Sequence, residues 1–337
     1  MLLSHPPIQV HGPRCPKPCP EFSLGPGATP SLGSNNRRAT SPPTHDCISS
    51  TQNSRPLQGT GRPPKEQFRC LQEKSNDTTA FLWKCPLTRS EAWTFYYACY
   101  LLSVSYPLSA SSLTRQQLDT IQRKAMSIIV PRCGFSRNTK KEILYGPMEL
   151  GGASFRPLWI QQGVSQTTLF LRQWRKNNQG GKLSCIALAW FQVQAGVSFP
   201  ILGNPDRTLP QLESKWFESL RTFLATIRAN IVIEDFVTPA LQRLHDFVIM
   251  DAVQASGLFS DAEIRRINYC RLYLQAETVS DIFTESGKCL DPSKLKGEWS
   301  LHSSRRHGNF IYQERPEGAA WSLWKKRTNY GAIALVN

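Results

Sequence analysis

The 337-residue sequence lacks the short motifs that mark the common catalytic and nucleotide-binding classes. It contains no GxxxxGK phosphate loop followed by Ser or Thr, no GxGxxG dinucleotide fingerprint and no GxSxG nucleophile turn. These absences argue against the usual P-loop, Rossmann and hydrolase sites. We therefore predict no catalytic residue, no cofactor, no metal and no small-molecule ligand.

Cysteine pairs and long apolar runs are also absent. The ten cysteines are scattered and form no Cys-x-x-Cys pair, so we interpret them as buried thiols in a reducing compartment. The most apolar stretch, residues 92–104, is well short of the roughly 20 residues that span a bilayer. Pro6 and Pro7 interrupt the first apolar residues, unlike in a signal peptide. We expect a soluble intracellular protein without membrane contact, in the nucleus or the cytoplasm.

Aromatic residues are scarce at the amino-terminal end, where proline is abundant. Residues 1–64 hold 13 of the 24 prolines, and Pro, Gly and Ser together fill 27 of these 64 positions. Phe22 is the only aromatic residue among them. Such a segment buries too little apolar surface to offset its chain entropy. We predict that residues 1–65 form a disordered tail.

From about residue 66 onward, helix signals recur along the chain. Three capping-box pairs, in which Ser or Thr is followed three positions later by Glu, mark helix starts: Thr88 with Glu91, Thr139 with Glu142, and Ser260 with Glu263. The run after Thr88, AWTFYYACYLL, is apolar nearly all round and predicts a deeply buried helix. A strand is the alternative for so aromatic a run, because periodicity alone does not decide between the two. Helical spacing of apolar residues predicts further helices over 114 to just before Pro131, 157–176, 183–195, 212–227 and 239–256.

The predicted fold class is mainly α, because few segments alternate strictly between polar and apolar residues. We expect only a small amount of strand, near the carboxyl end. Gly203, Pro205 and Pro210 interrupt the helical pattern near the middle of the globular part. The predicted organisation is a tail over 1–65, a helical region over 66–200 and a second, mostly helical region over 201–337.

Positive charge is unevenly distributed over these three parts. The whole chain has 40 basic and 25 acidic residues, a net charge of +15. The tail carries 7 basic and 2 acidic residues (+5), the region 66–200 carries 16 and 7 (+9), and the region 201–337 carries 17 and 16 (+1). The globular excess therefore lies in 66–200, and it suggests an acidic partner such as nucleic acid.

Within that region the charge is concentrated over residues 115–141. Seven basic residues face only Asp119, which gives a net charge of +6. Basic side chains on the exposed side of a helix and in the loop after it can neutralise phosphates. A solvated helix face without a ligand would have the same composition. We predict that the following residues bind nucleic-acid backbone: Arg115, Arg123, Lys124, Arg132, Arg137, Lys140 and Lys141.

A series of short motifs resembles the region that follows the polymerase palm in reverse transcriptases of non-LTR retrotransposons. The motifs run in the order Tyr106-Pro107-Leu108, Leu113-Thr114, Gln117 to Lys124, Gly134, Arg137, Lys140-Lys141, Leu144 to Pro147, Gly151-Gly152, Pro157-Leu158 and Gln161-Gln162-Gly163. The resemblance extends over about residues 85–200 and is looser beyond. In that family a helical thumb and a connection region follow the palm, and the thumb helices pack along the primer–template duplex. The resemblance thus implies a thumb-like helical region that binds a DNA or RNA duplex.

The chain departs from this family in its carboxylates. The palm supplies metal-binding carboxylates partly through a Tyr-x-Asp-Asp-like turn, and this sequence has no adjacent aspartates. The resemblance and this departure together imply a non-catalytic remnant that binds nucleic-acid backbone. An α-helical protein–protein interaction module without nucleic-acid binding is the alternative that the sequence leaves open.

Overall fold

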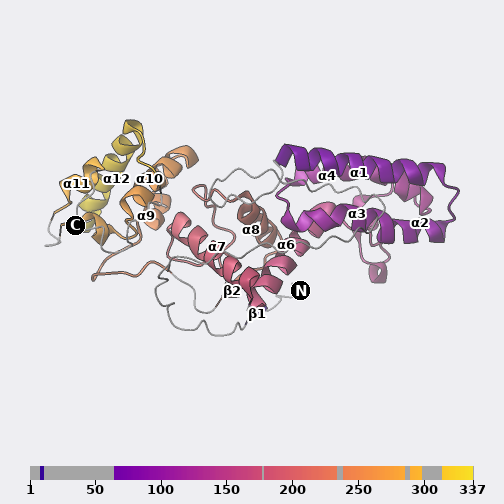
Figure 1. Cartoon of the computed structure of the whole chain (residues 1–337), viewed down its shortest axis with the longest axis horizontal. Coiled ribbons are helices and arrows are strands. Elements are labelled where there is room, and N and C mark those ends of the chain that lie inside the picture. The colour runs from indigo at the N-terminus through magenta and orange to yellow at the C-terminus, as the bar shows by residue number, and fades with distance from the viewer. Residues whose placement is uncertain are drawn as a thin grey trace, which may run out of the picture. The chain divides into compact units, whose positions relative to one another are not determined.

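The computed structural model describes residues 8–10, 64–176, 178–233, 238–284, 289–297 and 313–336. Within these ranges the chain is mainly helical, which confirms the predicted fold class (Figure 1). The predicted disordered tail, residues 1–65, lies almost entirely outside the described residues. Three residues of that tail, Ile8–Val10, form strand β1, which pairs in parallel with β2 (Ile231–Ile233).

The first hydrophobic cluster unites the helices of the basic region. Its elements are α1 (Pro64–Lys84), α2 (Arg89–Phe95), the π-helical segment η1 (Tyr96–Leu101), α3 (Leu102–Ser105), the 3-10 helix η2 (Tyr106–Ala110), α4 (Arg115–Arg132), α5 (Lys141–Tyr145) and the start of α6 (Leu158–Arg175). The 3-10 helix η3 (Met148–Leu150) lies between α5 and α6 and contributes no residue to the cluster. Helices α1 and α4 lie side by side (Figure 1). The cluster buries Leu82, Tyr96, Leu118 and Ile129 completely.

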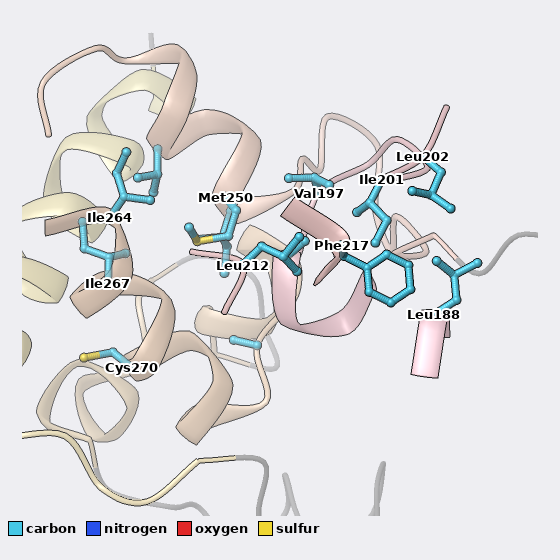
Figure 2. Close-up of a cluster of buried hydrophobic side chains, with 14 of the residues drawn as sticks. Leu188, Val197, Ile201, Leu202, Leu212, Phe217, Met250, Ile264, Ile267 and Cys270 are labelled. Carbon is cyan, nitrogen blue, oxygen red and sulfur yellow. The ribbon is translucent and has the colours of Figure 1, made fainter. Parts of the chain in front are cut away.

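The second hydrophobic cluster begins in α6 and continues toward the carboxyl end. Its other elements are α7 (Gln179–Ala195), α8 (Lys215–Thr226), β2, α9 (Ile249–Ala255), α10 (Asp261–Leu274), the 3-10 helix η4 (Val279–Ile282) and α12 (Gly318–Val336), while α11 (Pro292–Lys296) contacts α12. Figure 2 shows part of this cluster, with Leu188 from α7, Phe217 from α8 and Ile267 from α10. Trp321 and Trp324 of α12 are buried in it. Helix α6 therefore contributes to both clusters.

Two of the three predicted capping boxes form as expected. Thr88 accepts the N–H of Glu91, and Ser260 accepts that of Glu263, while each glutamate accepts the N–H of its capping residue. The third prediction is wrong. Helix α5 begins one residue later than predicted, with Lys140 as N-cap, because Thr139 donates its N–H to the Ser136 carbonyl in the preceding turn.

Several predicted helix bounds also need correction. Helix α4 continues through Pro131 to Arg132, since a proline in the last turn removes one N–H but leaves the earlier turns intact. Helix α7 begins at Gln179 rather than at residue 183, because the Asn178 side chain accepts the N–H of Gly181 and caps the extra turn. The prediction for α6 agrees with the structure within one residue at each end.

Within the predicted helix over 239–256 only α9 (Ile249–Ala255) is helical, so the prediction is wrong for residues 239–248. The carboxylate of Asp246 accepts backbone N–H groups from Gln242, Phe247 and Ser280. These bonds satisfy donors that a helix would otherwise have to pair, and they hold the segment in an irregular conformation. The bond to Ser280 comes from a segment distant in sequence, so local periodicity could not reveal it.

Candidate nucleic-acid interface

Helix α4 provides the scaffold of the predicted basic surface. Its start is fixed by a capping box between Thr114 and Gln117, in which each side chain accepts the other's backbone N–H. Its apolar side packs into the first cluster through Leu118, Ile121 and Ile129. The opposite side of α4 is exposed to solvent. A basic side chain there keeps its hydration, so it costs the folded state less free energy than a buried one would.

Five of the seven predicted residues are exposed cations without an acidic partner. They lie on the outer side of α4, in the loop after it and at the start of α5: Arg123, Lys124, Arg137, Lys140 and Lys141. Within the part of the chain that the structure describes, none of these five forms a salt bridge. A group of uncompensated charges of one sign leaves a positive potential that attracts anions.

The other two predicted residues, Arg115 and Arg132, have aromatic partners within the chain. The guanidinium carbon of Arg115 lies 5.1 Å from the centre of the Trp159 ring. That of Arg132 lies 6.0 Å from the centre of the Trp83 ring, and its Nη2 donates to the Trp83 carbonyl at 2.9 Å. Both arginines are therefore held in place at the two ends of α4, with their charges retained.

The sequence prediction also left out Arg156, an exposed arginine whose backbone is bonded to α4. Its exposed guanidinium lies 5.9 Å from the centre of the Tyr97 ring. Its backbone is fixed as well, because its N–H donates to the Tyr96 hydroxyl and its carbonyl accepts the Gln122 side chain of α4. An isolated arginine in an irregular segment, 24 positions after Arg132, gave no signal of its own in the sequence.

Two buried glutamines of α6 bond to the segment between η2 and α4 and to α8. The Gln162 amide donates to the Leu113 carbonyl at 2.9 Å and to the Ser219 hydroxyl at 3.1 Å. The Gln166 amide donates to the Ser111 carbonyl at 2.7 Å. Because hydrogen bonds are directional, this network specifies how the helices are rotated against one another more strictly than apolar contacts do.

Two further arginines are buried and serve the fold. Desolvation lowers the pKa of Arg221 and of Arg271 to about 10. Arg271 donates to the Val193 and Gln194 carbonyls at the end of α7. Arg221 donates to backbone carbonyls in the loop before α8. Both guanidinium groups are buried and their Nη2 atoms donate to the protein's own backbone, so we do not include them in the candidate interface.

Cysteine burial is mixed. Cys133 and Cys270 are buried, and desolvation raises the pKa of both thiols to about 12. Cys99 and Cys289 are exposed, so the prediction of buried thiols is wrong for these two. Among the described residues, no three His, Cys, Asp or Glu side chains come together as metal ligands would. Trp321 and Trp324 are both buried, so neither offers a free face for a base.

Comparisons of the chain with protein families, with curated proteins and with solved structures yield no match. None of the described helices combines the length and the apolar character needed to cross a membrane. The basic surface around α4 is the feature of the described chain that most directly suggests a ligand.

Proposed function

We propose that the chain binds the phosphate backbone of nucleic acid through α4, the loop after it and the start of α5. In this proposal the region acts like the thumb that follows the palm in non-LTR retrotransposon reverse transcriptases, without the polymerase carboxylates. The observation that carries the proposal is the set of five exposed cations that have no acidic partner among the described residues.

Repulsion between these cations supports a polyanionic partner. Over residues 115–141 seven basic residues accompany one aspartate, whereas residues 201–337 hold 17 basic and 16 acidic residues. A surface that serves solubility alone gains from mixed charges, because like charges placed together destabilise the folded chain. A duplex relieves this repulsion and releases its own condensed counterions when it binds.

The test is the salt dependence of binding to a mixed-sequence DNA duplex. Engaging about four phosphates gives a slope of about −3 to −4 in a plot of log affinity against log salt. The triple variant Arg123→Ala, Lys140→Ala, Lys141→Ala should weaken binding on all sequences alike. Each lost contact should reduce the steepness of the slope by about one.

A matched control removes the same charge from the charge-balanced region. The control variant Arg266→Ala, Lys325→Ala, Lys326→Ala also lacks three exposed cations, which lie on α10 and α12. It should keep the slope and most of the affinity of the wild type. Equal losses in both triple variants would mean that net charge, rather than the α4 surface, governs binding.

A second candidate is the protein–protein interaction module. The run predicted to form a deeply buried helix keeps one face exposed: Leu102 is 63% exposed, and Tyr106, just after the run, is 86% exposed. Apolar side chains of this size gain free energy when a partner covers them. Unchanged affinity and slope in the Arg123, Lys140 and Lys141 variant would favour this second candidate.

A further inference from the structure

Trp83 is a large aromatic residue left on the surface where the last turns of α1 and α4 meet. It is 58% exposed, although the neighbouring Leu82 is completely buried. Arg132 reaches from α4 to the Trp83 carbonyl and also lies 6.0 Å from the centre of the indole ring. The ring is therefore held against a cation while more than half of its residue remains open to solvent.

Two further cations follow Trp83 closely along the chain. Lys84 is exposed at the end of α1, and Arg89 is exposed at the start of α2. Arg89 extends to the end of α4, because a Cβ built on Gly134 would lie 2.7 Å from its Nε atom. Glu91, the nearest acidic residue in sequence, is engaged by the N–H and the hydroxyl of Thr88.

The ends of helices attract cations for a structural reason, since their last carbonyls are unpaired and carry partial negative charge. This accounts for Lys84 and for the bond from Arg132 to the Trp83 carbonyl. It does not account for an exposed indole that is held against Arg132 and followed along the chain by two more exposed cations. A flat apolar face beside positive charge fits an unpaired nucleobase next to its phosphate.

We infer that Trp83, with Lys84, Arg89 and Arg132 around it, stacks an unpaired base of a single-stranded nucleic acid. This inference rests on the proposed function and extends it from duplex backbone to single strands. The faces of duplex bases are already stacked on one another, so only an unpaired base offers a free face to the indole. The three cations contact the phosphates on either side of that base.

The experiment compares two probes: a blunt mixed-sequence DNA duplex, and the same duplex with a single-stranded extension of about eight nucleotides. Stacking of one base on an aromatic ring is worth about 1–3 kcal/mol, or about 5- to 150-fold in affinity. Trp83→Leu should lower the affinity for the extended probe by a factor in this range and leave the blunt probe unaffected. Trp83→Phe should retain much of the affinity, because it keeps an aromatic face.

Phe81 offers a matched control on the same helix. It is 57% exposed, close to the value for Trp83, but its ring stacks on Phe95 with a centroid distance of 5.8 Å. No described cation lies over the Phe81 ring. Phe81→Leu should bind both probes as the wild type does.

Three results would overturn the stacking inference. The first is wild-type affinity of Trp83→Leu for the extended probe, and the second is an equal loss on both probes. The third is an acidic peptide that displaces the extended probe from the wild type as well as a single-stranded oligonucleotide of equal charge does. Blunt-duplex binding and its loss in the Arg123, Lys140 and Lys141 variant test the proposed function separately, so the two ideas fail on different measurements.

Discussion

The packed contact between Gly163 of α6 and Phe223 of α8, here called the seam, should be destabilised by even one added methyl group. A Cβ built on Gly163 of α6 would lie 2.1 Å from ring atoms of Phe223 on α8. Carbon atoms in contact are normally about 3.5–4.0 Å apart, so Gly163→Ala requires the ring or the helix to move by about 1.5 Å. Phe223 is 3% exposed, which leaves it little room to move.

Two opposing effects set the size of the expected change. Overpacking a core costs about 1–3 kcal/mol, while replacing glycine by alanine inside a helix gains about 1 kcal/mol. We expect Gly163→Ala to lower the free energy of unfolding by up to about 2 kcal/mol. The measurement is urea denaturation followed by circular dichroism, with Gly180→Ala as control. The Cβ of that control would meet only atoms of polar side chains, the nearest being Gln173 Oε1 at 3.0 Å.

A double-mutant cycle isolates the contact itself. Phe223→Leu removes the ring and makes room, so it should cost less in the Gly163→Ala background than in the wild type. A coupling free energy of about 1 kcal/mol or more is expected. Additive effects of the two substitutions, or a net stabilisation by Gly163→Ala alone, would show that the seam relaxes freely and that the steric argument is wrong.

Two further predictions concern stability. Gln162→Leu should lower the free energy of unfolding by about 2–4 kcal/mol, because the buried Leu113 carbonyl and the Ser219 hydroxyl lose their donor. As a control, Gln161→Leu on the same helix should change the free energy of unfolding by less than about 1 kcal/mol. Burial raises the pKa of Asp246, but N–H donors including Gln242 and Ser280 outweigh it and hold that pKa below its usual value. Its contribution is therefore present above about pH 4 and is lost as the pH falls through the lowered pKa, so the penalty of Asp246→Ala in urea denaturation should shrink at acidic pH.

The sequence predicted helices best where local chemistry alone fixes them. The capping boxes at Thr88 and Ser260 each lie within one stretch of chain, and both form. The prediction failed at residues 239–248, where the Asp246 carboxylate bonds to the distant Ser280. It also missed β1, because the pairing of that strand with β2 joins residues more than 200 positions apart.

For the candidate interface, the sequence identified the charges but not their surroundings. Local composition sufficed to find Arg123 and Lys124, because a helix exposes the side opposite to its apolar face. The ring beside Arg115 belongs to Trp159, 44 positions later, and the ring beside Arg132 belongs to Trp83, 49 positions earlier. Contacts between segments so far apart have no signature in composition or periodicity, so their discovery required the structure.

The buried glutamines give the basic surface its fixed arrangement. Gln122 lies on α4 one position before Arg123, and its amide bonds to the Arg156 carbonyl and to the Leu158 N–H at the start of α6. An apolar residue at this position would fill the space but would let α4 rotate against α6. Rotation by one residue, about 100°, would replace the outer cations by the apolar stripe. The same amide therefore ties the backbone at Arg156 to α4 beside Arg123, an arrangement that the proposed binding to duplex phosphates would use.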